Sequence, residues 1–600
     1  MSAAVEALAK LANHPDAKAG NTQEKKLHAM AVQFYSYLLK NKDGSGGDMK
    51  KSIRDNVRRA LSALGSICRF YECHDACDSH NLDPNGFCVI TDVKQLQFSG
   101  NVLSSACFAL FRLYLEQDDE STKCLALRAM NGVFISRPRV VLVAEQLGII
   151  TYAISDAAPP SVQIESLRCW RDILLAEEKR IESGAAKVKL EAQKNVSVSK
   201  RISGDQDGDS CISGSVLTKH ADRLYELTLS KDENVRHMII DLLGHLLRQG
   251  LINPMATVPY LLAVQGDVES PATRSLALKL LINEGEKRPD MLRQRVCAGL
   301  KAAFSFQKNV YPHNKNGVPR VTALLTKSDG PTVITETIFD AIIKESGMQS
   351  KRAPREGLLK GIISLFEKDP DSEDTSIDKL PLLAFASEIL AHLPYTALND
   401  PLFIIYHSSC ITALDGQTII ARFAELLGAD LLDPNSGEDD LERAAKKGKV
   451  KPDKFGLTSK TNADLFGQLC VNACRILPLL QLKTFLRKAY NISESRMTEY
   501  VPSEKERIHE KGVSISDSIP AFSCAFEPIF DTEQQINWLN ASKIYTLFRC
   551  LMRDSDVDDL HVDEGSKISP KRNSQKRKRG DSSGSCGDVQ VVASPKITPD

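Results

Sequence analysis

Residues 232–262 contain two helix-like stretches joined by a marked corner, and this feature constrains the fold more than any other. Apolar residues recur three and four positions apart, as in a helix that buries one face: Val235, Met238, Ile239, Leu242, Leu243, Leu246 and Leu247. Gly250 suits a left-handed C-cap, while Asn253 and Pro254 suit an N-cap and a first helical turn. Such a pair cannot bury its apolar faces alone, and similar pairs recur along the chain. The pattern therefore predicts an all-α fold, an α-solenoid of stacked helix pairs.

The bulk composition agrees with an extended helical array. Six hundred residues are too many for one compact core, and an aromatic content of 6% favours helix packing over a β-sandwich or barrel. The 77 basic and 77 acidic side chains cancel, so only local patches can argue for nucleic acid. We find no signal-peptide pattern and no uninterrupted apolar run of roughly 18 residues, and the 15 cysteines are scattered. We therefore expect an intracellular, soluble protein without disulfides and with no membrane association.

Changes in composition along the chain predict its organisation. We expect an N-terminal helical segment (1–40), a flexible linker (41–52), helix-pair repeats (53–182), a disordered linker (183–214), further repeats (215–429), a charged disordered loop (430–460), terminal helices of the solenoid (461–553) and a disordered tail (554–600).

No catalytic signature is present. The sequence has no phosphate-binding glycine loop, no HExxH and no GxSxG motif, which makes a binding scaffold the favoured class and an enzyme the disfavoured one. The nearest approach to a metal site is the cluster Cys68, Cys73, His74, Cys77, His80 and Cys88. Its spacing matches no two-plus-two zinc knuckle, and Cys68 falls on an apolar helix stripe. We therefore predict no metal site and no cofactor.

Basic residues gather in two neighbouring stretches. Residues 291–328 hold seven basic side chains and no acidic one, and 351–360 add four more. The candidates for phosphate contact are Arg293, Arg295, Lys301, Lys351, Arg352, Arg355 and Lys360. Stacked helices could align them into a positive stripe that binds DNA without reading its sequence. The alternative is an ordinary solvated face.

The tail carries a predicted nuclear localisation signal, KRNSQKRKR at 571–579, whose basic residues are Lys571, Arg572, Lys576, Arg577, Lys578 and Arg579. Nonspecific binding of polyanions is the alternative reading. Ser569 lies in a Ser-Pro-Lys-Arg motif typical of proline-directed kinase sites, and Ser594 and Thr598 also precede proline. Phosphorylation of Ser569 would place about two negative charges beside the basic run and weaken its hold on acidic partners.

Several stretches resemble one family more closely than a generic solenoid. The segment LLRQGLINPMATVPYLLAVQGDVESPATRSLALKLL (246–281) resembles the signature of the cohesin-loader large subunit, the Nipped-B family. SKRAPREGLLKGIISLFEK (350–368), LAHLPYTALNDPLFIIYHSS (390–409) and LQLKTFLRKAYNISESRMTEYVPSEKERIHEKG (480–512) resemble later segments of the family in the same order.

The resemblance, which spans about residues 50 to 553, implies a hook of HEAT repeats in the nucleus. It implies binding to double-stranded DNA in chromatin and to the SMC heads and kleisin of cohesin, whose ATPase it would stimulate for sister chromatid cohesion, cohesin loading and transcription control. Family positions for DNA contact carry over to Lys351, Arg352, Arg355 and Lys360. Members of the family are longer and wrap a TPR-type partner with an N-terminal arm, so we expect that partner only if such an arm precedes Met1. The competing interpretation is an importin- or adaptor-like solenoid that binds peptides without DNA.

Overall fold

The computed structural model describes residues 2–563 apart from a set of gaps. These are 13–21, 43–50, 71–86, 92–99, 183–207, 289, 312, 316–317, 321–323, 330–331, 338, 346–350, 369–374, 428–442, 444–456, 458, 505–506, 516–521, 523, 525–527 and 531–534.

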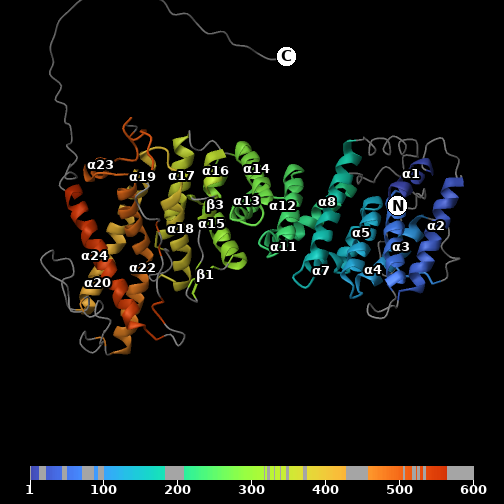
Figure 1. The fold of residues 1–600 in the computed structure, drawn as a ribbon, viewed down its shortest axis with the longest axis horizontal. Coiled ribbons are helices and arrows are strands. Elements are labelled where there is room, and N and C mark those ends of the chain that lie inside the picture. Colours follow the sequence, from blue (N-terminus) through green and yellow to red (C-terminus); the bar gives the residue numbers. More distant parts are fainter. Residues whose placement is uncertain are drawn as a thin grey trace, which may run out of the picture.

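Helices dominate the described chain and follow one another along its long axis in sequence order (Figure 1). The first set is α1 (Ser2–Ala12), α2 (Thr22–Lys40), α3 (Lys51–Phe70), α4 (Gly100–Leu115), α5 (Glu120–Ser136), α6 (Val140–Gln146), α7 (Ile149–Ala153), α8 (Pro160–Glu182), α10 (Gly208–Lys219), α11 (Ala221–Leu227), α12 (Glu233–Arg248), α13 (Pro254–Val264), α14 (Pro271–Lys287) and α15 (Met291–Val310). The second set is α16 (Asp340–Glu345), α17 (Arg352–Ile363), α18 (Leu380–His392), α19 (Asn399–Ile411), α20 (Gln417–Leu427), α22 (Lys460–Ala489), α23 (Glu494–Thr498) and α24 (Trp538–Asp563). Two short 3-10 helices, η5 (Ser364–Phe366) and η6 (Ile377–Lys379), and the π-helix η7 (Thr412–Gly416) complete them.

The predicted corner between α12 and α13 forms as its residues indicate. Gly250 has a φ of 71°, which only glycine adopts cheaply, and the next amide, of Leu251, donates to the carbonyl of Leu246 over 2.9 Å. The Asn253 side chain accepts from the amide of Met255 at 3.0 Å, directly before a first-turn proline. The chain therefore reverses here and packs α12 against α13.

The described strands form two small antiparallel hairpins inserted between α15 and α16. Strand β1 (His313–Lys315) pairs with β2 (Val318–Arg320), and β3 (Leu324–Asp329) pairs with β4 (Thr332–Thr337). The sequence analysis placed this stretch within helical repeats, so the hairpins are a local exception to the all-α prediction, which is otherwise confirmed for the described chain.

Helices of one layer contact the equivalent helices of the next repeat. One succession of contacts joins α3, α5, α8, α12 and α14, and a second joins α13, α15, α17 and α19. Glycine permits the closest crossing, because a Cβ on Gly132 would lie 2.2 Å from the carbonyl oxygen of Gly65 and one on Gly65 2.5 Å from Cα of Ala129. The core is a continuous band between the two layers.

Ion pairs between an arginine and a carboxylate of a neighbouring repeat tie the array together. They join Arg58 to Asp119 (2.9 Å), Arg128 to Glu165 (2.7 Å), Arg171 to Asp241 (3.1 Å), Arg236 to Asp267 (2.7 Å), Arg355 to Asp400 (2.8 Å) and Arg475 to Asp415 (2.7 Å). The Arg236–Asp267 pair is fully buried, whereas the Arg171–Asp241 pair is about one third exposed. Removing one partner of the buried pair should therefore destabilise the array more than removing one partner of the exposed pair.

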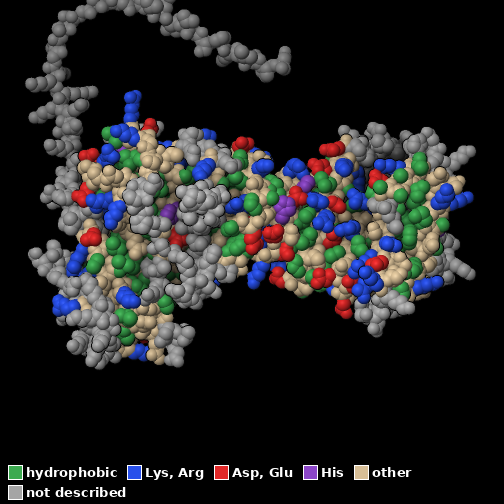
Figure 2. Space-filling model, in the orientation of Figure 1, with side chains coloured by type: hydrophobic (Ala, Val, Ile, Leu, Met, Phe, Trp, Pro, Cys, Tyr) green, Lys and Arg blue, Asp and Glu red, His purple; other side chains and the backbone are tan. Residues whose placement is uncertain are grey.

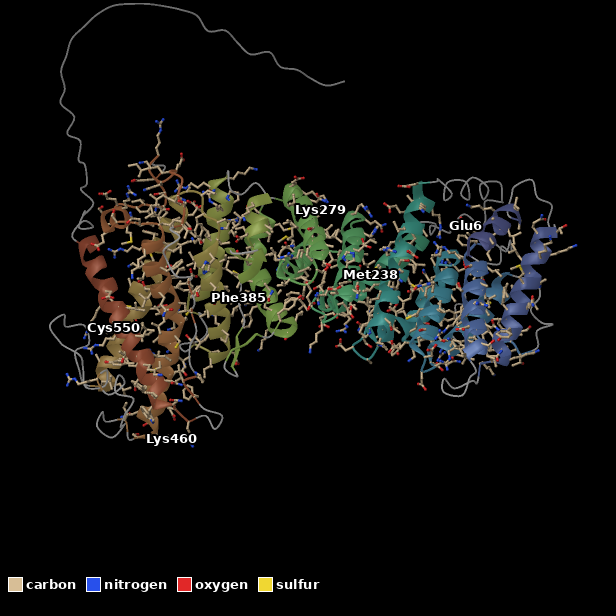
Figure 3. The ribbon with its side chains drawn as sticks, viewed as in Figure 1. Glu6, Met238, Lys279, Phe385, Lys460 and Cys550 are labelled. Atoms are coloured by element: carbon tan, nitrogen blue, oxygen red, sulfur yellow. The ribbon has the colours of Figure 1, made fainter. Side chains whose placement is uncertain are left out.

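Helix α22 is the longest of the described helices. By length and hydropathy alone it could cross a membrane, but 83% of its most apolar window is buried inside the structure. It begins at Lys460, at one extremity of the molecule, and packs against α18, α19, α20 and α24 (Figures 1 and 3). We therefore interpret it as the core helix of the C-terminal end.

Some predicted boundaries differ from the structure. Helix α10 begins at Gly208, inside the range 183–214 that the sequence analysis assigned to a linker, and α24 runs to Asp563, beyond the predicted end at 553. The predicted tail from 564 onward, and most of the predicted linker and charged loop, lie outside the described residues.

Candidate nucleic-acid interface

Helices α15 and α17, which carry the basic candidates, lie parallel and very close together. Two glycines on α17 make this possible: a Cβ on Gly357 would lie 2.5 Å from Cδ of Arg293, and one on Gly361 would lie 2.4 Å from Cγ1 of Val296. The Cys297 thiol donates to the carbonyl of Gly361, which fixes the same register. Side chains from the two helices can therefore share one surface.

Four of the seven candidates are exposed on this pair of helices. Lys301, Lys351 and Lys360 are exposed, and the Arg293 side chain is 53% exposed while its stem covers Gly357. Arg293 makes a 3.4 Å ion pair with Asp290, itself 75% exposed, so water and salt keep this interaction weak. These four groups remain available to phosphates.

Arg295 is only partly available. Its side chain is half-buried, and its Nε is buried without a hydrogen-bond partner among the residues that the structure describes. A buried donor of this kind costs free energy until a partner reaches it. The other guanidinium nitrogens would have to make any contact with a ligand.

Arg355 is not a surface residue, which corrects its assignment to DNA. It is buried, and its Nε donates to Oδ1 of Asp400 at 2.8 Å. Burial raises the pKa of Asp400, and the charge of Arg355 opposes that effect. If Arg355 turned outward to a phosphate, the buried carboxylate of Asp400 would lose its charged partner, which is costly. Arg355 therefore stays in place and holds α17 to α19.

Arg352 is also committed, in this case to a segment that covers the end of α17. We call residues 499–504 and 507–513 the strap. Arg352 donates to the carbonyls of Pro502 (2.9 Å) and Glu504 (3.2 Å) and to the carboxylate of Glu356 (2.6 Å). The Arg352 side chain therefore fastens the strap and does not stand on an open basic surface, and its contact with DNA stays a prediction.

The strap is fixed to α19 as well. The amides of Leu398 and Asn399 donate to the carbonyls of Lys511 (2.9 Å) and His509 (2.7 Å). The Tyr500 hydroxyl donates to Oδ1 of Asn399 at 3.0 Å, and Nδ2 of Asn399 donates to Glu356 at 2.9 Å. Three stretches quoted for the family resemblance, within 350–368, 390–409 and 480–512, thus meet at one junction.

The composition of these segments gave no signal for the junction. Arg352 and Arg355 sit three residues apart in a basic stretch, and nothing in that spacing distinguishes a buried ion pair or a strap contact from a phosphate contact. Their partners lie 45 and 150 or more residues away. The only link in the sequence between these arginines and their distant partners was that both lie in segments that follow one another as in the Nipped-B family.

Beyond Lys301, the exposed face of α15 leads to a polar cleft of about 700 Å³. The cleft is lined by Asp156, Gln163, Arg223, Glu226, Leu227, Leu229, Ser230, Lys231, Lys308 and Asn309. Arg223 is neutralised by Asp156 and Glu226, which leaves the exposed Lys308 as a further cation seven residues after Lys301, on the same side of α15.

Charges of both signs mix over the face of the molecule in Figure 2, where Lys and Arg side chains alternate with Asp and Glu among the described residues. A single broad positive field is therefore not the basis of the candidate interface. The interface depends on a local group: Arg293, Lys301, Lys351, Lys360 and, beside the cleft, Lys308.

The remaining candidates lie outside the described residues. This holds for the basic run 571–579, for the three proposed phosphorylation sites, and for most of the cysteine and histidine cluster after Cys68. Cys68 itself is buried in α3, on the apolar stripe where the sequence placed it. Within the described chain no group of three metal-binding side chains occurs.

Comparison with known proteins relates the fold to a family. Residues 213–411 match the family model described as sister chromatid cohesion C-terminus, Nipped-B_C. The human Nipped-B-like protein is 20% identical over 491 residues, which cover 76% of this chain and 16% of that protein. The Drosophila melanogaster Nipped-B protein is 24% identical over 326 residues, 52% of this chain and 14% of that protein.

The same relation appears in three dimensions. The C-terminal fragment of the Chaetomium thermophilum cohesin loader SCC2 superposes with a TM-score of 0.56 at 13% identity, covering 95% of this chain and 34% of that one. This likeness shows a shared helical fold. The chain spans about one sixth of the length of the human relative, and its match falls on the C-terminal family model. The family model over residues 213–411, the relatives and the shared fold together relate this chain to the C-terminal part of the Nipped-B proteins.

Proposed function

We propose that this chain is the DNA- and cohesin-binding helical part of a cohesin loader. Residues 213–411 match the family described as sister chromatid cohesion C-terminus. The similar solved structure is that of a cohesin loader, SCC2 of Chaetomium thermophilum. As a helical scaffold related to this family, the chain is not an enzyme. Any ATP hydrolysis that it stimulates would take place on the SMC heads of cohesin.

One observation carries the DNA part of the proposal: Arg293, Lys301, Lys351 and Lys360 are exposed on two helices held in close contact by Gly357 and Gly361. Cations on rigid neighbouring helices can meet successive phosphates of a duplex, and they bind through charge without reading bases. Arg352 and Arg355 would contribute by fixing the helices and not by touching DNA.

The cohesin part rests on the family and on the strap. A concave solenoid offers a long surface to an extended partner. The strap, which follows α22 and α23 in the chain, joins α17 to α19. We propose that this end engages the SMC heads and the kleisin, in the nucleus and on chromatin. A TPR-type subunit would join only where an N-terminal arm is present.

The experiment is a titration of fluorescent duplex DNA with the purified chain at several salt concentrations. The test variant carries Lys301→Glu, Lys351→Glu and Lys360→Glu. Each lost phosphate contact removes about 0.9 from the slope of log K against log salt, so the three changes should flatten that slope by about 2 to 3. Affinity at low salt should fall in parallel.

The matched control reverses Lys25, Lys26 and Lys40, which are exposed on α2 far along the array. It makes the same change in net charge at a remote place. Equal slopes for the two triple variants would remove the α15–α17 surface from the proposal. A wild-type chain without salt-dependent DNA affinity, but with affinity for peptides, would favour the adaptor-like alternative.

A further inference from the structure

The strap presents one serine at the tip of a tight turn over the end of α17. The amide of Glu504 donates to the carbonyl of Val501 at 3.1 Å, which closes a four-residue turn with Pro502 and Ser503 at its centre. Proline suits the second position of such a turn because its φ is already fixed near the required value. Val501, Ser503 and Glu504 are exposed. Ser503 is therefore within reach of a modifying enzyme.

The residues after Ser503 suit one class of modifying enzyme. Glutamates follow at the first and third positions, Glu504 and Glu506, and acidophilic Ser/Thr kinases select serines with a carboxylate at the third. The pattern is short, and Ser436 and Ser555 carry it as well. The contacts around Ser503 in the folded chain therefore carry more weight than the pattern.

An arginine holds the turn on both sides of this serine. The carbonyls of its two neighbours, Pro502 and Glu504, accept from the Arg352 guanidinium at 2.9 and 3.2 Å. Hydrogen bonds to both neighbours keep the guanidinium close to Ser503 itself. A phosphate on Ser503 would add three acceptor oxygens and about two negative charges within reach of a cation that is already in place.

Lys351 supplies a second cation at the same place. It directly precedes Arg352 at the N-cap of α17, and it is exposed. An ammonium group on a flexible four-carbon stem can turn to a neighbouring phosphate. Because Lys351 is also one of the candidate DNA contacts, a phosphate on the strap and a phosphate of DNA would compete for its charge.

Carboxylates near the turn oppose the phosphate only in part. Glu499 and Glu504 are exposed, so water and salt screen their repulsion. Glu356 is bound to Arg352 at 2.6 Å and to Asn399 at 2.9 Å, and a phosphate would share Arg352 with it. A hydrogen bond from a guanidinium to a charged phosphate is stronger than one to a peptide carbonyl. The net effect of the phosphate should therefore be attraction.

We propose that Ser503 is a phosphorylation site of an acidophilic Ser/Thr kinase, and that its phosphate pairs with Arg352 and Lys351. The kinase transfers the γ-phosphoryl group of ATP to Oγ of Ser503: a new O–P bond replaces the bond to ADP, and the hydroxyl proton leaves. The phosphate fastens the strap more firmly and withdraws Lys351 from DNA. This control of DNA binding rests on the proposed function, whereas the modification and the fastening do not.

The first test treats the full chain with a purified acidophilic kinase and Mg-ATP and maps the phosphate by mass spectrometry. We expect phosphate on Ser503, and a chain phosphorylated elsewhere but not there would overturn the assignment. Its effects are measured on a chain with phosphoserine encoded in place of Ser503 alone, so that other sites do not contribute. The matched control carries phosphoserine in place of Ser495, which is exposed on α23 and has Thr498, not a carboxylate, at the third following position.

Limited proteolysis tests the fastening of the strap. Phosphoserine in place of Ser503 should slow cleavage within the strap several-fold relative to the unmodified chain, and Arg352→Ala should abolish this protection. Phosphoserine in place of Ser495 should leave strap cleavage unchanged. Faster cleavage, or protection that persists in Arg352→Ala, would overturn the pairing with Arg352.

The salt titration with duplex DNA tests the competition for Lys351. Loss of one phosphate contact should flatten the slope of log K against log salt by about 0.9 and lower the affinity about eightfold near 0.1 M salt. In Lys351→Ala the slope should be the same with and without the phosphate, and an equal further drop there would overturn the competition. If the unmodified chain lacks salt-dependent affinity for DNA, the proposed function fails, and the kinase and proteolysis measurements still decide whether Ser503 is the site.

Discussion

Replacing Arg236 by alanine should destabilise the middle of the array more than any exposed charge change. The side chain is fully buried and donates to both oxygens of Asp267, at 2.7 and 3.0 Å, and to the carbonyls of Ser230 and Lys231, each at 3.0 Å. It also donates to the Tyr311 hydroxyl at 3.2 Å. The residue thus joins α12 to the corner before α14 and to the end of α15.

The magnitude follows from what the substitution leaves behind. Asp267 has no exposed surface, and without Arg236 it would be an unpaired buried carboxylate that keeps only its neutral donors, among them Tyr311 at 2.8 Å. Breaking a buried pair by removing one partner costs about 3 to 5 kcal/mol. The exposed Arg171–Asp241 pair should cost at most about 1 kcal/mol when Arg171 is replaced by alanine.

The assay is urea unfolding followed by circular dichroism, together with hydrogen exchange of α12–α15. In a solenoid each repeat contacts only its neighbours, so faster exchange should be confined to these helices and the adjacent ones. In a double-mutant cycle, Asp267→Asn should recover part of the loss caused by Arg236→Ala. An Arg236→Ala free energy of unfolding within about 1 kcal/mol of that of Arg171→Ala would refute the reasoning.

Three further predictions address the strap, a buried histidine and helix crossings. Arg352→Ala should release the strap, and limited proteolysis should cleave it faster than in the wild type; equal cleavage rates would contradict its role as a fastener. Burial lowers the pKa of His392 below its ordinary 6.5, so the unfolded chain takes up the proton first and stability is lost as the pH falls below that value. His392→Phe should therefore show a shallower loss of unfolding free energy between about pH 7.5 and 5.5, whereas an unchanged slope would exclude this histidine as a source. Gly132→Ala should cost about 1 to 3 kcal/mol in urea unfolding, while Gly285→Ala, whose Cβ would meet only one atom at 4.0 Å, should be neutral or stabilising; the reverse order would contradict the packing.

Local chemistry in the sequence was enough to predict the repeating unit. The spacing of Val235, Ile239 and Leu242 fixes which face of α12 is buried, and Gly250 and Asn253 fix where the chain turns. These signals act within a few residues of themselves, so a sequence reading captures them. The α-solenoid followed from their repetition.

The candidate interface was only partly predictable, because burial of a charge depends on distant partners. Lys360 and Arg355 look alike in the sequence, yet Lys360 is exposed and Arg355 is buried against Asp400. The hairpins between α15 and α16 had local signals that the sequence analysis passed over, because Asn316-Gly317 and Asp329-Gly330-Pro331 are turn sequences between short runs of strand-forming residues. Long-range contacts decided only the burial of the charges.

The most direct test of the loader assignment is the ATPase turnover of purified cohesin with DNA, measured with and without the 600-residue chain. We expect faster turnover that depends on DNA and is reduced by the triple variant of Lys301, Lys351 and Lys360. Unchanged turnover, from a chain that also lacks salt-dependent affinity for DNA, would contradict this assignment.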